Sequence, residues 1–289
     1  MHKAGFVNIF GKPNAGKSTL LNALLGEKLA IISSKVQTTR HRIKGFITGQ
    51  DYQIILSDTP GIIDPTYKLH EKMMRAVKNS LEDADVAILL VDARKEVEES
   101  HTIFSALHLK VPGIIVLNKI DAVKPAQIEQ KKLFFSAQPY TSKVLAISAL
   151  KQTHLEELVN TVLSFLPESE PFYPKDELTD MPTRFFVSEL IREQLYNLLD
   201  EEMPYQTTVL VREFTEKTTL TKIVADIIVQ RESQKGIVLG ERGAMIKKIG
   251  SAARTEIEKF IDRKVFLELF VKVRPHWRDN ELYLKEYGY

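Results

Sequence analysis

Short apolar runs alternate with amphipathic stretches over residues 1 to about 165. The runs predicted as strands are Phe6–Phe10, Ile43–Ile47, Tyr52–Leu56, Val86–Val91, Gly113–Leu117 and Val144–Ile147. The segments predicted as helices are Lys17–Leu25, His70–Leu81, Ser100–Leu107, Ile128–Phe135 and Leu155–Phe165. Strands that alternate with helices predict a mostly parallel sheet covered on both faces. The short turn Thr48–Asp51 joins two runs and predicts one reversed strand.

The pattern changes after Pro167, where prolines and acidic residues up to Pro182 predict a linker. Beyond it the sequence predicts a helix, two strands, a helical region and a last strand, at Arg184–Leu199, Thr207–Phe214, Leu220–Arg231, about Gly236 to Phe260, and Val265–Val273. We therefore predict two domains, residues 1–167 and 183–289, joined by the linker 168–182.

Bulk composition limits the class of protein only loosely. A hydrophobic content of 44% with 27% charged residues is typical of a soluble globular chain, and the net charge of +2 neither supports nor excludes a nucleic-acid partner. The absence of cysteine excludes disulfides and cysteine metal sites. Met1–Lys3 runs straight into the first apolar run, so no signal peptide is predicted, and no apolar run is long enough to span a bilayer. We expect a cytoplasmic protein.

The loop after the first strand matches the pattern GxxxxGK[ST], whose backbone N–H groups surround phosphate oxygens. Lys17 is expected to reach the β- and γ-phosphates and Ser18 to ligate Mg²⁺. A glycine turn that only connects strand to helix is the alternative, and the strand–loop–helix context disfavours it. The residues of this loop predicted to bind nucleotide are Gly11, Lys12, Pro13, Asn14, Ala15, Gly16, Lys17, Ser18 and Thr19.

A second motif, Asp58-Thr59-Pro60-Gly61, follows the third strand. Asp58 at a strand end beside a phosphate loop is placed to hold Mg²⁺, and the backbone N–H of Gly61 can approach a γ-phosphate. A plain Asp-Pro-Gly turn is the alternative. The next residue, Ile62, is included in the predicted nucleotide site.

A loop threonine between these motifs could close over Mg²⁺ while γ-phosphate is present and release when it leaves. Thr38 and Thr39 are adjacent, and we favour Thr39. Either hydroxyl could instead cap the following backbone.

Two later motifs predict which base is bound. In Asn118-Lys119-Ile120-Asp121 the Asp121 carboxylate can accept both hydrogen bonds from the edge of guanine, whereas adenine lacks that donor pair. Lys119 can lie along base and ribose, and Ser148-Ala149-Leu150 can offer a backbone N–H to guanine O6. Alone, the first motif could be a helix N-cap at Asp121, but the order of the motifs, each after a strand, favours a guanine site over an ATPase.

In the C-terminal part, Gly240-Glu241-Arg242-Gly243 forms a GxxG pattern before a helical stretch that carries Lys247 and Lys248. The stretch from Arg242 to Arg254, both included, contains four basic residues and no acidic one. With the predicted element order, this resembles a KH domain whose GxxG loop clamps single-stranded RNA. A helix–turn–helix packing corner is the alternative, and Glu241 departs from the usual loop residues. Trp277 is predicted to be a packing anchor rather than a base-stacking platform.

The chain resembles the bacterial Era family of translation-factor-class GTPases in its phosphate loop Gly11–Ser18, in Gln37-Thr38-Thr39-Arg40-His41, Asp58-Thr59-Pro60-Gly61 and Asn118-Lys119-Ile120-Asp121, and in its C-terminal half. The resemblance implies an α/β P-loop GTPase domain with a mixed, mostly parallel sheet, followed by a smaller α+β KH domain of type II. Families like Der, with two GTPase domains, or TrmE, with a C-terminal cysteine, fit less well. The resemblance to the Era family also implies binding to the 3′ end of small-subunit ribosomal RNA, a role in small-subunit assembly, and contact with the membrane surface. We expect a monomer.

The residues expected to act in hydrolysis are Lys17, Thr39, Gly61 and Asn14. Ile62 stands where Ras-like proteins have a water-orienting glutamine, so slow intrinsic hydrolysis is predicted. By similarity to related GTPases Asn14 would help hold K⁺; a hydrogen bond that stiffens the loop is an equal alternative. A different class of function stays open for the C-terminal domain, namely a protein-interaction or membrane-docking module.

Overall fold

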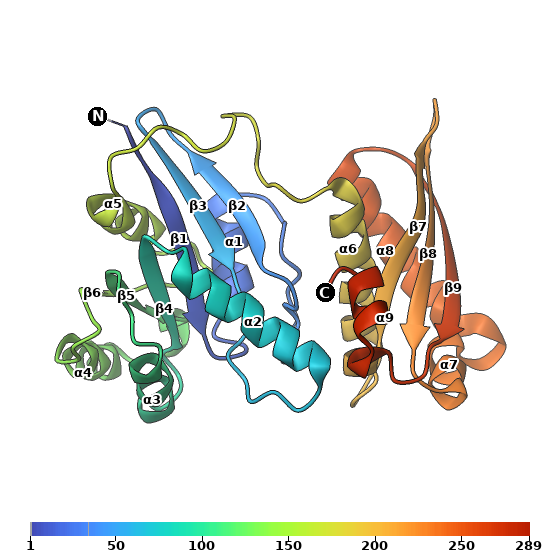
Figure 1. Cartoon of the computed structure of the whole chain (residues 1–289), viewed down its shortest axis with the longest axis horizontal. Coiled ribbons are helices and arrows are strands. Elements are labelled where there is room, and N and C mark those ends of the chain that lie inside the picture. The colour runs from blue at the N-terminus through green and yellow to red at the C-terminus, as the bar shows by residue number, and fades with distance from the viewer. Residues whose placement is uncertain (1, 34) are drawn as a thin grey trace. The chain divides into compact units, whose positions relative to one another are not determined.

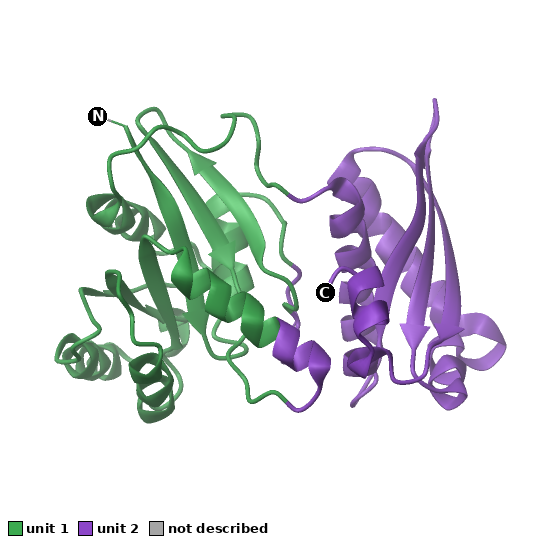
Figure 2. Cartoon of the chain, in the orientation of Figure 1, with its two compact units in different colours: residues 1–30, 39–65, 73–180 green, residues 31–38, 66–72, 181–289 purple. Residues whose placement is uncertain are grey.

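The computed structural model describes residues 2–33 and 35–289, which form two compact units (Figures 1 and 2). The first unit comprises residues up to Ala30, Thr39–Pro65 and Met73–Asp180. The second comprises Met181–Tyr289 and two short segments from the N-terminal part of the chain, Ile31–Thr38 and Thr66–Lys72. The chain therefore enters the second unit twice before its C-terminal part begins.

A six-stranded sheet forms the centre of the first unit, in the order β2-β3-β1-β4-β5-β6. The strands are β1 (Lys3–Gly11), β2 (Ile43–Thr48), β3 (Tyr52–Asp58), β4 (Val86–Asp92), β5 (Gly113–Asn118) and β6 (Lys143–Ala146). All neighbours pair in parallel except β2, which is antiparallel to β3. The predicted mixed sheet with one reversed strand is confirmed. Since parallel strands share one direction, the loops after β1, β3 and β5 leave from the same edge.

The helices of this part of the chain cover both faces of the sheet (Figure 1). They are α1 (Lys17–Leu25), α2 (Lys68–Glu82), α3 (Glu98–Ala106), α4 (Pro125–Ser136) and α5 (Leu155–Phe165). Val77, Phe104 and Phe135, from α2, α3 and α4, are buried in one cluster with strand residues such as Phe10 and Leu89. In Figure 1, α1 lies behind the sheet, where its Leu20 and Leu21 are fully buried. The bounds of α1 and α5 are those predicted.

The stretch 168–180, predicted as part of a linker, is hydrogen-bonded to the sheet, and its last residues contact the edge strand β2. The backbone N–H of Phe46 donates to the carbonyl of Leu178 at 2.9 Å, and the hydroxyl of Thr179 donates to the carbonyl of Lys44 at 2.7 Å. An edge strand exposes unpaired backbone groups, and this stretch satisfies some of them. Its proline-rich composition indicates an irregular path but not what that path contacts.

In the second unit, three strands lie in the order β7-β8-β9 with helices packed on one face. The elements are α6 (Thr183–Leu198), β7 (Thr208–Glu216), β8 (Thr221–Val229), α7 (Glu232–Leu239), α8 (Ala244–Ile261) and β9 (Val265–Val273). β7 and β8 are antiparallel, and β8 and β9 are parallel. The core joins Ile191 of α6, Ile223 of β8 and Ile257 of α8, all fully buried. The predicted element order is confirmed.

The boundary between β8 and α7 differs from the sequence prediction. The strand predicted to end at Arg231 ends at Val229, and α7 begins at Glu232 rather than near Gly236. The side chain of Gln234 accepts hydrogen bonds from the backbone N–H groups of Gln230 and Arg231, at 2.8 and 3.1 Å. These two hydrogen bonds satisfy backbone donors between β8 and α7, so the strand ends and the helix begins at this point.

The C-terminal tail adds a short helix, α9 (Glu281–Glu286), which the sequence pattern did not reveal. The Asn280 side chain caps it by accepting from the backbone N–H of Leu282 at 2.9 Å. Trp277 is fully buried, and its ring N–H donates to the carbonyl of Gln206 at 3.1 Å, which confirms its prediction as a packing anchor. Among residues 2–33 and 35–289, no helix combines the length and apolarity needed to cross a membrane.

Candidate functional site

The predicted phosphate loop, Gly11–Thr19, connects β1 to the first turn of α1. Gly16 has φ 100°, and a Cβ there would lie 2.4 Å from Nδ2 of Asn118. A Cβ at Gly61 would lie 2.9 Å from the backbone nitrogen of Pro13. Only glycine fits such contacts. The structure therefore brings the phosphate loop, the Asp58–Gly61 motif and the Asn118 motif together at one edge of the sheet.

Lys17 lies inside this loop and is buried. Its Nζ donates to the carbonyls of Gly11 and Lys12, both at 3.0 Å. Burial lowers the pKa of Lys17 to about 8, although the nearby Asp58 carboxylate opposes the shift. Lys12 forms an ion pair with the exposed Glu99. A phosphate anion would offer the Lys17 ammonium a stronger partner than two neutral carbonyls do.

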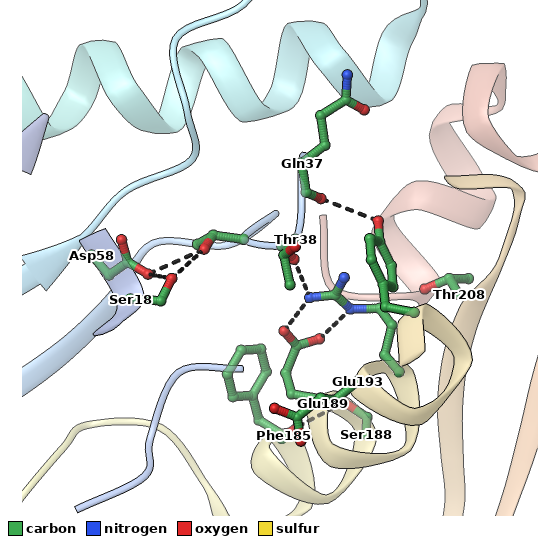
Figure 3. Close-up of polar contacts among 12 residues, drawn as sticks. Ser18, Gln37, Thr38, Asp58, Phe185, Ser188, Glu189, Glu193 and Thr208 are labelled. Atoms are coloured by element: carbon green, nitrogen blue, oxygen red, sulfur yellow. Dashed lines mark hydrogen bonds and ion pairs between the residues drawn. The ribbon is translucent and has the colours of Figure 1, made fainter. Parts of the chain in front are cut away.

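The three residues predicted to hold Mg²⁺ contact one another. Ser18 Oγ donates to Asp58 Oδ2 at 2.6 Å, and Thr39 Oγ1 lies 2.9 Å from Ser18 Oγ and 3.1 Å from Asp58 Oδ2 (Figure 3). Asp58 Oδ1 is buried and has no hydrogen-bond partner among the described residues. Burial raises the pKa of Asp58, against the opposing influence of Lys17 and the two hydroxyls. Three oxygen-bearing side chains thus converge on one point.

The two adjacent threonines have different surroundings. The hydroxyl of Thr38 donates to the carbonyl of Lys35 at 2.8 Å, a local turn contact. The hydroxyl of Thr39 is the one beside Ser18 and Asp58. This geometry favours Thr39 over Thr38 as a metal-facing residue.

The residues that follow Asp58 are packed closely. The hydroxyl of Thr59 donates to the carbonyl of Ile9 at 2.7 Å, and Pro60 and Gly61 are buried. The side chain of Ile62 is partly buried and packs against the apolar cluster of the sheet. It offers no hydrogen-bonding group to a water molecule.

Asn118 connects the predicted base site to the phosphate loop. Its Nδ2 donates to the carbonyl of Ala15 at 2.9 Å, and its Oδ1 accepts from the backbone N–H of Ala149 at 3.0 Å. Lys119 has φ 69°, and its Nζ donates to the carbonyl of Asn14 at 2.6 Å. Backbone and side chain contacts thus fix the spacing between the predicted phosphate and base sites.

Asp121 lies in a short 3₁₀ turn, Ile120–Ala122, and is exposed. The hydroxyl of Ser148 donates to its Oδ1 at 2.5 Å. Ser148 itself is fully buried, whereas Leu150 is 72% exposed. A buried hydroxyl therefore orients a solvent-facing carboxylate, which is the geometry needed to present two oxygens to a flat base edge.

Asp92, at the end of β4, belongs to this site but was not predicted. Its Oδ2 accepts from Lys119 Nζ at 2.9 Å and from Arg94 Nη2 at 2.7 Å. Burial alone would raise the pKa of Asp92, but hydrogen bonds from Arg94 and Lys119 outweigh it and lower the pKa to about 2. An acid at the end of the strand between β1 and β5 was a signal available in the sequence, because all three strand ends meet at this edge.

Replacing Asp92 by asparagine should weaken GTP and GDP binding equally, by about fivefold, because Lys119 loses a charged hydrogen bond that holds its stem in place. The rate at saturating GTP should not change. Arg94→Ala is the matched control, since it leaves the Lys119–Asp92 contact intact and should shift affinity less than twofold. Calorimetric titration of each variant measures both; unequal losses for the two nucleotides would contradict this role.

The GxxG loop separates α7 from α8. Gly240 has φ 71° and ψ 174°, and a Cβ there would lie 2.7 Å from Cβ of Met245. Gly243 has φ 79°, with open space around the position of a Cβ. Glu241 and Arg242 are both exposed. Gly240 is thus required both by its positive φ and by the lack of room for a side chain, whereas Gly243 is required by its positive φ alone.

The basic residues predicted beside the loop lie on the outer surface of α8. Lys247, Lys248 and Arg254 are all exposed. Lys247 and Arg254 also line a groove of about 440 Å³ between α8 and β9. A positive rim beside a GxxG loop suits a phosphate backbone.

The floor of this groove is apolar. Ile246, Leu267 and Leu269 line it together with Gly250, where a Cβ would lie 3.5 Å from Cδ1 of Leu269. Sequence reasoning did not identify these four residues as part of the site. A glycine inside a helix was the available signal, because it costs helix stability and so indicates close packing or binding.

The chain is similar to known proteins over its whole length. A family model described as 50S ribosome-binding GTPase matches residues 6–119, and a KH domain model matches residues 202–278. GTPase Era from Clostridium botulinum (strain Eklund 17B / Type B) is 41% identical over 292 residues, covering 100% of this chain and 99% of the relative. GTPase Era from Geotalea uraniireducens (strain Rf4) is 44% identical and covers 99% and 98%.

Two solved structures are similar over nearly the whole chain. One is an Aquifex aeolicus Era variant bound to GDP and AlF4⁻, with a TM-score of 0.95, 41% identity and 99% coverage of each chain. The other is Era in complex with MgGDPNP and nucleotides 1506–1542 of 16S ribosomal RNA, with a TM-score of 0.95, 40% identity and coverage of 100% and 99%.

The fold and the assembled motifs define a P-loop GTPase with a C-terminal KH domain. Sequence identity above 40% to these two relatives, over the full length of the chain, identifies the family within this class. The chain belongs to the GTPase Era family. The predicted family and fold class are confirmed.

Proposed function

We propose that this GTPase binds single-stranded RNA through its KH domain, at the 3′ end of small-subunit ribosomal RNA, and assists assembly of that subunit. The proposal rests on two sites that occur in the same chain. The first is the convergence of Ser18, Thr39 and Asp58 beside the phosphate loop. The second is the GxxG loop beside a groove with a basic rim.

Mg²⁺ fits the cluster of Ser18, Thr39 and Asp58. Two hydroxyls and a carboxylate are the hard oxygen donors that Mg²⁺ prefers. The buried Asp58 Oδ1, which has no partner among the described residues, would be satisfied by a cation or its bound water. When bound, the ion would supply positive charge that offsets the charge of the phosphates.

The other proposed roles follow from position. Lys17 holds the β- and γ-phosphates by charge, and the backbone N–H of Gly61 donates to the γ-phosphate. Asp121 accepts from the guanine edge, oriented by Ser148. Ile62 packs against the core and offers no group that orients water. Slow hydrolysis without an outside partner therefore stays our prediction.

Potassium binding stays a proposal. Asn14 has φ 61° within the phosphate loop, and its carbonyl accepts from Lys119. A role for its side chain in holding K⁺ beside the phosphates rests on similarity to related GTPases. Stiffening of the loop by a hydrogen bond of the same side chain is the alternative.

The RNA target rests on the similar Era structure that holds nucleotides 1506–1542 of 16S ribosomal RNA. The description of the GTPase family model names the 50S particle instead, but that model covers only residues 6–119. We give more weight to the full-length match because it includes the KH domain. We propose that the protein acts in the cytoplasm, where the small subunit is assembled. Peripheral contact with the membrane and a monomeric state stay predictions.

Gly243→Asp should weaken RNA binding about tenfold, because it places a carboxylate where the loop would meet a phosphate. Gly243 is the better test position than Gly240, since open space surrounds it. Fluorescence anisotropy with a single-stranded RNA of the small-subunit 3′ end, at two salt concentrations, measures the loss.

Gly243→Asn is the matched control. Asparagine has nearly the shape of aspartate, tolerates the left-handed backbone and carries no charge, so its effect should stay within about threefold. GTP affinity should be native in both variants. If neither variant changes RNA affinity, the C-terminal domain is better explained as a protein-interaction or membrane-docking module.

A further inference from the structure

Helix α6 carries charged side chains that are buried instead of solvated. Glu189, Arg192 and Glu193 are 4%, 1% and 3% exposed. Charges are costly to bury unless they are paired and hydrogen-bonded. The partners of these residues therefore indicate why the helix contains them.

Arg192 and Glu189 form a two-bond ion pair. Arg192 Nε donates to Glu189 Oε1 at 2.8 Å, and Nη2 donates to Oε2 at 2.5 Å. The same Nη2 donates to the backbone carbonyl of Thr38 at 2.5 Å (Figure 3). Glu189 thus fixes the plane of the guanidinium, and the guanidinium fixes one peptide carbonyl.

The segment that contains this carbonyl, Ile31–Thr38, clusters with the C-terminal unit although it lies between α1 and β2 in the chain. Tyr196 adds a second contact from α6, because its hydroxyl donates to the carbonyl of Gln37 at 3.1 Å. The backbone N–H of Ile32 donates to Glu193 Oε1 at 3.1 Å. The segment is therefore held at its start and at its end.

Lys35 adds further contacts between the same segment and α6. Its Nζ donates to the carbonyl of Tyr196 at 2.7 Å and also to that of Leu199. These two carbonyls lie at the C-terminal end of the helix, where a cation is favoured by the helix dipole.

The residue after Thr38 is Thr39, whose hydroxyl lies beside Ser18 and Asp58. The peptide unit between Thr38 and Thr39 is planar, so a held Thr38 carbonyl also sets the direction in which the backbone enters Thr39. Arg192 is therefore one peptide plane away from the Mg²⁺-facing hydroxyl of the proposed site.

We propose that Arg192, oriented by Glu189, is a positioning residue for the GTP-bound state: it holds the Thr38 carbonyl so that the Thr39 hydroxyl is presented to the metal and γ-phosphate site. The proposal rests on the proposed role of Thr39. It adds that a side chain of the second unit stabilises the GTP-bound form. GDP has no γ-phosphate, so GDP binding does not depend on Arg192.

The competing explanation is that the ion pair only stabilises α6. The double variant Glu189→Met with Arg192→Met separates the two, because replacing a buried pair by apolar side chains of similar size can leave stability unchanged while it removes the donor to Thr38. Arg192→Lys keeps a charge and a donor but loses the planar fork. Arg184→Met, at an exposed position of the same helix, is the control.

The measurement is the affinity of each full-length variant for Mg²⁺–GDPNP and for GDP by calorimetry, with single-turnover GTP hydrolysis and the melting temperature beside it. We expect the double variant to bind GDPNP about tenfold more weakly and to hydrolyse GTP about tenfold more slowly, with GDP affinity within twofold of native. Arg192→Lys should lower the ratio of GDPNP to GDP affinity about threefold, and Arg184→Met should leave it native.

A native affinity ratio and rate in a folded double variant would overturn the proposal and leave the pair a structural one. If the double variant does not fold, Arg192→Lys decides in the same way, since a purely structural role predicts no change in the ratio. Failure of the proposed function would look different, because the native chain itself would then show no preference for Mg²⁺–GTP and no hydrolysis.

Discussion

Thr39→Ala should lower the rate of GTP hydrolysis about a hundredfold while GDP affinity stays within twofold of native. The Thr39 hydroxyl lies 2.9 Å from Ser18 Oγ and 3.1 Å from Asp58 Oδ2, where a metal-bound γ-phosphate would need it. GDP lacks that phosphate, so its binding should not depend on this hydroxyl. Single-turnover hydrolysis and calorimetry with GDP measure the two quantities.

Thr38→Ala is the matched control for this prediction. The Thr38 hydroxyl donates to the nearby carbonyl of Lys35, and the substitution keeps the backbone carbonyl that Arg192 contacts. We expect a change of about threefold or less. If Thr38→Ala gives the large loss and Thr39→Ala does not, the roles of the two residues are reversed.

Asp121→Asn should weaken GTP binding about a hundredfold, close to 3 kcal/mol, because guanine N1–H and N2–H₂ would face an amide that offers one acceptor in place of two. Xanthine carries an oxygen where guanine has its amino group, so the asparagine N–H₂ can donate to it. XTP should therefore bind the variant more tightly than GTP does. Competition titrations with GTP and XTP measure the reversal.

Asp51→Asn controls for the loss of one negative charge, since Asp51 lies in the exposed turn between β2 and β3. It should leave both nucleotides bound as in the native chain. A variant at Asp121 that loses GTP without gaining XTP would indicate damage to the loop, for instance through loss of the Ser148 hydrogen bond. A variant that keeps native GTP affinity would contradict the base assignment.

The parts of the structure that the sequence predicted well are those set by local pattern. Glycine, lysine and a hydroxyl at fixed spacing define the phosphate loop, and the alternation of apolar runs with amphipathic segments defines the sheet. The bounds of α1, α5 and β9 agree with the prediction. The motifs lie close together because each of them follows a strand at the same edge of the six-stranded sheet.

What the sequence did not reveal depends on contacts between distant segments. Glu189 and Arg192 have the spacing of an ordinary exposed ion pair on a helix, and their burial depends on which segments pack around α6. The stretch 168–180 has the composition of a linker, yet Leu178 and Thr179 hydrogen-bond to β2. Asp92 acquires its role only because β4 lies between β1 and β5. The pattern of residues along the chain indicates local structural preferences, whereas these three features depend on tertiary contacts.

The most direct test of the central claim is calorimetric titration of the native chain with GDP and with ADP, each in the presence of Mg²⁺. Because Asp121 can pair with the donor edge of guanine and with no such edge in adenine, we expect GDP to bind at least about a hundredfold more tightly than ADP. Equal affinities for the two nucleotides would contradict the assignment of a guanine-specific switch.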